Sequence, residues 1–226
     1  FKKKAGFTDE QYEYFQVELC NADTRYQQAF RKVASHKKFK GFENSENAFY
    51  KPSEGKVYMN FEKCMKQAQS YDFDTKHKTL FHEFGHAMDD ILGGRGKLSA
   101  RSEFSNAFEK DLVALKNRYD GDPKKFMSYI KSVVSDDNSN GVQDIFSAIP
   151  HIKTKGFDGS SLPKLPSSWR HTDEYWTRKN AAKEAQSELF AHISASRCSD
   201  MQGYYIDEFF PNSTKAFEEL LYSSVE

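Results

Sequence analysis

Five consecutive residues combine two histidines with a glutamate, in the order His82-Glu83-Phe84-Gly85-His86. Residues four apart on a helix lie on the same face, so both imidazoles can point to one metal ion. Zn²⁺ accepts nitrogen ligands in a tetrahedral arrangement. Glu83 would lie beside the open coordination position, where it can take a proton from a metal-bound water whose pKa the ion lowers to roughly 7. The motif therefore predicts metal-assisted hydrolysis.

The residues around the motif predict a helix over residues 74–94. Asp74 is a suitable N-cap, and the pair Gly93-Gly94 is a stop signal. Between them, apolar residues recur at helical spacing and give the helix an apolar side, formed by Leu80, Phe81, Phe84, Ala87, Met88, Ile91 and Leu92. This helix is expected to be buried, which suits a metal site better than a pair of surface histidines.

Two histidines alone bind zinc poorly, so a third protein ligand is expected, with water in the fourth position. No third histidine follows at short spacing, and a carboxylate on another helix is the natural choice. Glu188 is the first candidate, because it lies in the apolar stretch Ser187-Glu188-Leu189-Phe190-Ala191 of a helix predicted at about 177–198. Glu184, one turn earlier, is the alternative, and a third possibility is that neither carboxylate binds the metal. Glu184, Glu188 and His192 share one polar row.

Hydrolysis also needs a hydrogen-bond donor that faces the developing oxyanion. Tyr175 and His171 are the candidates, at the end of a loop-like segment over residues 150–172. Tyr175 could instead anchor that loop to the core together with Trp176. Metal-bound histidines need outer hydrogen-bond acceptors, and Asp89 and Asp90 could serve. No role is predicted for the remaining histidines discussed, His36, His77 and His151.

The segment from His82 to Asp90, together with Glu188-Leu189-Phe190-Ala191, resembles the catalytic domain of anthrax lethal factor and its relatives. Those proteins are gluzincins, and the resemblance implies a zincin-like fold, zinc held by His82, His86 and Glu188, and Glu83 as base. It implies, through a tyrosine near the third ligand, an assisting role for Tyr175. The C-terminal pattern, with Phe209-Phe210-Pro211 before a final helix, also looks like the metallopeptidase-type domains of phage minor head proteins.

The resemblance extends over residues 56–222 in pattern, and only the two zinc motifs are specific. Three departures stand out. The distance from His86 to Glu188 is longer than in lethal factor, so helices over 98–149 are interpreted as an insertion whose helices serve packing. Tyr175 lies farther upstream of the glutamate than the family tyrosine. His192 stands where many gluzincins carry an acid, four residues after the ligand.

The N-terminal part is predicted to hold one long helix and a β-hairpin. Thr8 and Gln11 have capping-box spacing at the start of a helix over residues 8–35. Over residues 47–61, a turn at 52–55 separates two strands, the second showing apolar alternation from Lys56 to Phe61. If this second strand forms the sheet edge above the metal, it could hold an extended peptide; it could equally be a strand without a ligand role.

The later elements are predicted from helical periodicity and from proline signals. Amphipathic helices are expected over 98–119, from Asp122-Pro123 onwards, and over 142–149. Pro211, with Asn212 or Ser213 as the cap, is expected to open the last helix.

Composition excludes several classes of function. Lys+Arg and Asp+Glu both number 33, and the sequence has no basic stripe, so nucleic-acid binding is not expected. No apolar run is long enough to cross a membrane. Three scattered cysteines favour reduced thiols over a disulfide framework. The expected location is the bacterial cytoplasm or a phage particle, and secretion stays open because the chain starts at Phe1 without a methionine.

The sequence thus predicts a mostly helical α+β protein with a zincin-like fold, in which a small N-terminal sheet covers the motif helix. A single domain is expected over 1–226, with an N-terminal helix and sheet at 1–61, the metal helix at 74–94, the insertion at 98–149, and the third-ligand and C-terminal helices at 173–222. The expected function is a zinc metallopeptidase that acts on proteins or peptides, as part of a larger phage-related polypeptide. The alternative is a non-catalytic structural or interaction domain that keeps the fold.

Overall fold

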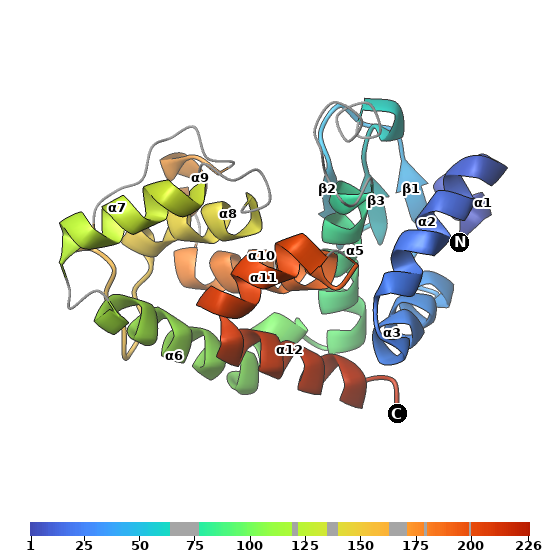
Figure 1. Cartoon of the computed structure of the whole chain (residues 1–226). Coiled ribbons are helices and arrows are strands. Elements are labelled where there is room, and N and C mark those ends of the chain that lie inside the picture. Colours follow the sequence, from blue (N-terminus) through green and yellow to red (C-terminus); the bar gives the residue numbers. More distant parts are fainter. Residues whose placement is uncertain (64–76, 119–121, 135–139, 163–170, 179, 199) are drawn as a thin grey trace.

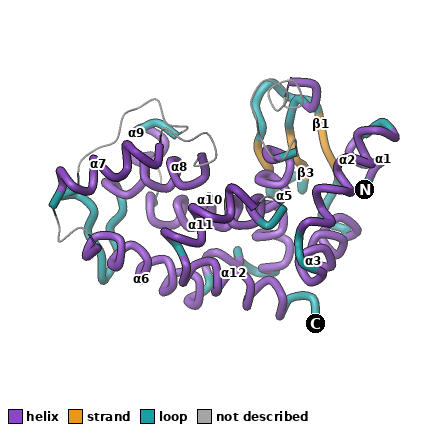
Figure 2. The backbone as a smooth tube through the Cα atoms, in the orientation of Figure 1, coloured by secondary structure: helices purple, strands orange, loops and turns teal. Residues whose placement is uncertain are grey.

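The computed structural model is mostly helical, with one small three-stranded sheet, and confirms the predicted α+β class (Figure 2). The structure describes residues 1–63, 77–118, 122–134, 140–162, 171–178, 180–198 and 200–226. Asp74, the predicted cap of the metal helix, and Cys64 lie outside the described residues. Of the other two cysteines, Cys20 is exposed and Cys198 is buried.

Two helices cross at the centre of the molecule and carry the predicted ligands (Figure 1). Helix α5 (Lys78–Gly93) contains both motif histidines, and helix α10 (Ala181–Ser196) contains Glu188. Gly85 lies at the crossing, where a Cβ atom would come within 2.9 Å of the Cα of Ala191 and the Cβ of Ser194. The glycine inside the motif therefore lets the two helices approach closely enough for their side chains to meet.

The ends of α5 partly match the prediction. The helix stops at Gly93, and Gly94 has a positive φ of 74°, a conformation that favours glycine. Its N-terminal neighbour His77 has no capping side chain of its own. Instead, the carboxylate of Glu18, from an N-terminal helix, accepts hydrogen bonds from the backbone N–H of His77 (3.1 Å) and from its Nδ1 (2.8 Å).

The sheet has the order β1-β3-β2 and lies next to α5 (Figure 1). Strands β2 (Phe49–Lys51) and β3 (Lys56–Tyr58) form the predicted hairpin, with Val57 and Met59 buried as the alternation requires. Strand β1 (Gly41–Glu43) was not predicted, and it pairs in parallel with β3. The second hairpin strand is therefore central, because β1 occupies its other side, and β2 is the edge strand.

The N-terminal segment differs from its prediction. Residues 8–35 form two helices, α2 (Asp9–Asn21) and α3 (Thr24–Ser35), after a short helix α1 (Lys2–Ala5). The predicted capping box of Thr8 and Gln11 is present. The single long helix is wrong, because the side chain of Asp23 caps a new helix through the backbone N–H groups of Arg25 and Tyr26.

The region predicted as a helical insertion forms α6 (Ser102–Arg118), α7 (Pro123–Val134) and α8 (Asn140–Ala148). A short 3-10 helix (Leu98–Ala100) precedes α6 and another (Ile149–His151) follows α8. Asp122 caps α7 as predicted, through the backbone N–H groups of Lys124 and Lys125. Helix α8 packs against α10, which brings this region next to the predicted ligands.

The predicted helix at 177–198 is also divided. Helix α9 (Asp173–Arg178) holds Tyr175, and α10 begins after Asn180, whose side chain accepts a hydrogen bond from the N–H of Lys183. Helix α11 (Asp200–Phe209) was not predicted and precedes the last helix, α12 (Pro211–Ser223). Tyr175 is therefore a helical residue and does not belong to the loop before it.

The start of α12 is held by a side chain from another helix. Neither Asn212 nor Ser213 is its cap, contrary to the prediction. Asp111 of α6, whose side chain is buried, accepts hydrogen bonds from the backbone N–H groups of both residues (3.1 and 2.8 Å) and from both of their side chains. This carboxylate satisfies the free N–H groups of the helix start.

One cluster of buried apolar side chains extends through the described elements from α1 to α12. Aromatic rings dominate it near the motif, where Phe84 stacks on Phe30 with ring centroids 4.0 Å apart. The inward side of α5 is thus packed in the core, as predicted, while its histidines remain partly exposed on another side. Among the described residues, no helix is both long and apolar enough to cross a membrane.

Candidate metal centre

The two motif histidines both face the carboxylate of Glu188. The Nε2 atom of His82 and the Nε2 atom of His86 each lie 3.3 Å from the same carboxylate oxygen, Oε2 of Glu188. Two ligands about 2.0–2.1 Å from a tetrahedral ion are separated by about 3.3 Å, so each histidine lies at a suitable distance from Glu188. Among the described residues, His86 is not in a group of three whose donor atoms all lie within 4.8 Å of one another, so a shared ion would require the two imidazoles to move closer together. The structure brings together the three residues predicted as ligands and favours Glu188 over Glu184 as the nearest carboxylate.

Charge and burial distinguish the two histidines. Burial lowers the pKa of His82 to about 4, with a further contribution from His192. Burial would also lower the pKa of His86, but the negative charge of Glu188 outweighs it and raises this pKa to about 9. Burial alone would raise the pKa of Glu188, and the neighbouring histidines hold it well below its usual value. Without a cation, the site thus holds a protonated His86 paired with an ionised Glu188.

A cleft of about 390 Å³ opens over the three residues. Glu83 lines it beside His82 and His86, as expected for a base next to the ligands. Strand β2 and the residues next to it form another wall, through Ala48, Phe49, Tyr50 and Pro52. A second hollow of about 220 Å³ shares Ala48, His82, Glu83 and His171 with the first, so the open space continues on both sides of Glu83.

Tyr175 lies in the cleft with its hydroxyl on the other oxygen of the ligand carboxylate. The hydroxyl donates to Oε1 of Glu188 at 2.9 Å, and Oε2 of Glu184 is 3.5 Å away. Burial, together with the charge of Glu188, raises the pKa of Tyr175, so the phenol stays protonated and is a donor. The indole N–H of Trp176 donates to Ser147 Oγ at 2.9 Å, which fixes α9 against α8.

His171, the second predicted donor, lines both hollows and stacks on Tyr175 with ring centroids 4.0 Å apart. Its Nδ1 atom lies 2.6 Å from Oδ1 of Asp144, a buried residue of α8. Burial would lower the pKa of His171, but the hydrogen bond with Asp144 and its negative charge outweigh it and raise the pKa.

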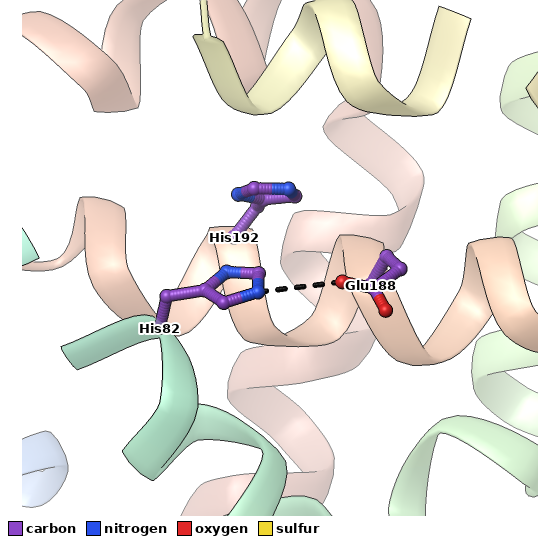
Figure 3. A group of neighbouring side chains, drawn as sticks. All are labelled: His82, Glu188 and His192. Atoms are coloured by element: carbon purple, nitrogen blue, oxygen red, sulfur yellow. Dashed lines mark ion pairs between the residues drawn. The ribbon is translucent and has the colours of Figure 1, made fainter. Parts of the chain in front are cut away.

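His192 joins the group from α10, one turn after Glu188 (Figure 3). Its Nε2 atom is 3.1 Å from Oδ2 of Asp144, and its ring centroid is 4.3 Å from that of His82. Donor atoms of His82, Glu188 and His192 lie within 4.8 Å of one another, as do those of Asp144, His171 and Glu188. Either group of three residues could hold a metal ion.

Ser187 provides the contacts behind His86. Its hydroxyl lies 3.4 Å from Nδ1 of His86 and 3.3 Å from Oδ2 of Asp89, and it accepts a hydrogen bond from Nζ of Lys97 at 2.7 Å. Asp89 therefore reaches the histidine through Ser187, and its carboxylate mainly accepts from the backbone N–H and the hydroxyl of Ser99. The prediction that Asp90 contacts a histidine is wrong for this structure, since it accepts from Tyr50.

The remaining histidines lie away from the cleft. His77 pairs with Glu18, His151 Nε2 lies 3.1 Å from Asp173, and His36 accepts from the backbone N–H of Lys38. These contacts are consistent with the absence of any role predicted for them.

The donor set fits a divalent cation by its chemistry. Two imidazoles and one carboxylate, with a partly solvent-accessible cleft beside them, are ligands that zinc uses in catalytic sites. One feature is atypical: Nδ1 of His82 is buried and has no hydrogen-bond partner among the described residues, whereas ligand histidines commonly donate from this side. Comparison with protein-family models, curated proteins and solved structures gives no match for this chain.

Sequence reasoning did not assign a role to Asp144, Ser187 or Lys97, which surround the ligands. A signal existed for Asp144, because it is an acid within the otherwise apolar row Val142, Ile145 and Phe146. The same reasoning had selected Glu188 on its own helix. Ser187 and Lys97 carry no such signal, since serine and lysine are common at helix surfaces and in loops.

Proposed function

We propose that this chain is a zinc-dependent metallopeptidase with a zincin-like fold, which hydrolyses peptide bonds. The observation that supports it most directly is the convergence of His82, His86 and Glu188 within one cleft that Glu83 and Tyr175 also line. A zinc ion held there would activate water and polarise the substrate carbonyl. A motif glutamate beside paired histidines has no evident use in a purely structural metal site.

The residues of the chain have separate tasks in this proposal. Glu83 takes the proton from the attacking water and passes it to the leaving amine. Tyr175 remains protonated, and its hydroxyl, which donates to Oε1 of Glu188 in this structure, would turn to the oxyanion as it forms, with His171 beside it as the second donor. Glu188 would help to hold the ion, and its Oε1 atom accepts the hydrogen bond that keeps the hydroxyl of Tyr175 at the ligand carboxylate.

The edge strand gives a place for the substrate backbone. Strand β2 pairs with β3 on one side, and residues 48–50 and 52 line the cleft. An extended peptide that pairs with the other side of β2 would pass over Glu83. Strand β2, before the turn, is therefore the candidate for binding the substrate backbone, in place of the strand predicted at 56–61.

The test measures zinc content and cleavage of a peptide library by the purified chain. The wild type is expected to bind one zinc ion and to cleave, and Glu83→Gln is expected to keep the zinc and to lose at least about 100-fold in kcat. Glu103→Gln, an exposed change on α6, is the matched control and should leave both unchanged. Equal cleavage by wild type and Glu83→Gln would show that the assigned base is wrong.

A non-catalytic metal-binding domain is the second candidate, and the position of His192 favours it. If His192 turned from Asp144 to the ion, four protein ligands would close the site, as in structural zinc sites. X-ray absorption of the zinc-loaded protein separates the two functions by the number of histidine ligands. Three histidines and no coordinated water support the structural role, and two histidines with an oxygen from water support the peptidase.

A further inference from the structure

A buried carboxylate in the region interpreted as an insertion holds two histidines of the site. Asp144 on α8 is 1% exposed, and its two oxygens contact different rings: Oδ1 lies 2.6 Å from Nδ1 of His171 and Oδ2 lies 3.1 Å from Nε2 of His192. The chemistry proposed above does not use Asp144. A buried carboxylate with two such partners fixes the orientation of both rings.

The first ring faces the cleft. Because Asp144 takes the Nδ1 side of His171, Nε2 is the nitrogen left for a ligand in the cleft that this histidine lines. The ring is also stacked on Tyr175 and lies edge-on to Trp176, with centroids 4.0 and 5.2 Å away. The carboxylate of Asp144 thus fixes one side of His171, and the rings of Tyr175 and Trp176 pack against it. This places His171 next to the Tyr175 hydroxyl that donates to Glu188.

The second ring supports a ligand. The ring of His192 lies against that of His82, with a centroid distance of 4.3 Å. Gly141, one turn before Asp144, lets α8 approach this ring, because a Cβ atom there would come within 3.1 Å of Cγ and Nδ1 of His192. The carboxylate and the glycine of α8 together hold His192 in place.

We propose that Asp144 is a positioning residue of the active site, which holds His171 as a donor to the substrate carbonyl oxygen and His192 against the ligand His82. The inference rests on the proposed peptidase function. It changes the interpretation of residues 98–149: helix α8 forms part of the catalytic machinery and is more than a packing element. Asp144 itself contacts neither substrate nor metal.

The distances favour hydrogen bonding over a second metal ion at Asp144. The 2.6 Å contact between Oδ1 and His171 is a short hydrogen bond, just below the range of about 2.7–2.9 Å for charge-assisted bonds. It is much shorter than the separation of about 3.3 Å between two ligands on one tetrahedral ion. The charge of Asp144 also favours the imidazolium form of His171, which places a proton on Nε2. In that form the ring can donate to an oxyanion.

The experiment compares zinc-loaded wild type with Asp144→Asn, His171→Gln and the double variant. Asp144→Asn should keep one zinc per chain and lose about 100-fold in kcat, with KM changed little. The double variant should be no slower than the slower single variant, because each change removes the same donor, the protonated His171. The alkaline limb of the pH profile should move to lower pH in Asp144→Asn, since neutral asparagine no longer stabilises protonated His171.

The matched control is Asp111→Asn, an equally buried aspartate that holds the start of α12. It should lower thermal stability without altering kcat or the pH profile of the folded protein. Gly141→Ala tests the role of Asp144 and α8 in holding His192. It displaces His192 and should lower zinc affinity, while the alkaline limb of the pH profile, which depends on His171, should not move. This variant also keeps the test open if Asp144→Asn does not fold.

A readout independent of cleavage separates this inference from the proposed function. Nitrogen NMR of the wild type should show His171 protonated at Nδ1, and Asp144→Asn should change that signal. A wild type that cleaves nothing but shows this proton contradicts the proposed peptidase, whereas a wild type that cleaves but lacks this proton contradicts the positioning role of Asp144. An unprotonated Nδ1, additive losses in the double variant, or a second zinc ion that Asp144→Asn removes would each overturn the inference.

Discussion

Ser187 is the residue that faces the Nδ1 side of His86. The serine hydroxyl joins the Nδ1 side of this ring to Asp89 and receives a hydrogen bond from Lys97. Outer contacts of this kind orient a ligand imidazole and select the nitrogen that carries its proton. The contact of 3.4 Å to His86 is long for a hydrogen bond, and a metal ion on Nε2 should draw the ring into a better one.

Replacing this serine should therefore weaken metal binding. We expect Ser187→Ala to lower zinc affinity by about tenfold or more, since loss of outer partners commonly costs 10–100-fold. Competition with a chelating dye measures the affinity. Ser196→Ala is the matched control on the same helix, because its hydroxyl bonds only to the backbone oxygen of Ile193 and to Arg197. Equal affinities of the two variants would contradict the assigned role of Ser187.

The charge on His86 predicts a pH dependence of metal binding. Its pKa is raised to about 9, so the metal-free site carries a proton there throughout the neutral range. A histidine that binds a metal must be neutral, and binding expels this proton. Zinc affinity should therefore rise about tenfold per pH unit up to pH 9 and then level off. His82, with a pKa lowered to about 4, releases none.

Calorimetry of zinc binding in two buffers with different ionisation enthalpies counts the protons released. At about pH 6, His82 is neutral and His86 is protonated, because their pKa values are about 4 and about 9. One proton released per zinc is therefore expected. A count of zero would mean that His86 is already neutral and that its pairing with Glu188 is not as described.

At the scale of elements, the crossing of α5 and α10 sets the geometry of the site. Gly85 at this crossing leaves no room for a methyl group beside Ala191 and Ser194. Gly85→Ala should push the helices apart, lower the free energy of unfolding by about 1–3 kcal/mol and weaken zinc binding. Chemical denaturation and dye competition measure the two effects.

Gly96→Ala is the control for this prediction, because nothing lies within 4 Å of a Cβ atom at that position and its φ is not positive. It should leave zinc affinity unchanged. If Gly85→Ala bound zinc as tightly as the wild type, the close approach of the helices would not be what positions Glu188.

Elements with strong local signals were predicted from the sequence, and breaks within periodic stretches were not. The hairpin has a turn signal, α7 has the cap Asp122, and the motif helix has a glycine pair at its C-terminal end. Apolar periodicity continues across Asp23, so α2 and α3 were predicted as one helix, and the helix predicted at about 177–198 ran across Asn180. Both breaks have an N-cap residue as their signal, which periodicity outweighed. Strand β1, with three residues, exists through its pairing with β3.

The candidate site divides in a similar way. His82, Glu83 and His86 could be identified because a helix fixes their spacing, and Glu188 because an acid in an apolar helix needs a partner. The contacts of Asp144 depend on how α8 packs on α10, which no local pattern reports. Helix α8 was therefore predicted correctly as an element, while its contribution to the site was missed.

At the scale of the whole molecule, the proposed metal site links helices that are distant in the sequence. A cation bound by His82, His86 and Glu188 would join α5 to α10, and α10 packs on α8, α11 and α12. A ligand that binds only the folded state adds to its stability by mass action. The metal should therefore stabilise the entire fold and not the cleft alone.

Zinc at a hundredfold excess over its Kd should raise the free energy of unfolding by about 2.7 kcal/mol. Thermal unfolding with zinc and with a chelator measures this shift, in a single transition if the core unfolds as one cluster. His82→Ala is the control, because it removes a ligand and should make the melting temperature insensitive to zinc. The same shift in His82→Ala would place the bound ion elsewhere.

Trp176 is buried beside His171 and Tyr175, so its intrinsic fluorescence can report on this part of the cleft. A charged imidazole next to an indole quenches its fluorescence, so emission should follow the protonation of His171 without any added dye. Trp169 is the second tryptophan of the chain, and Trp169→Phe would leave a single emitter. A titration curve recorded in this variant would follow His171 in the absence of any substrate.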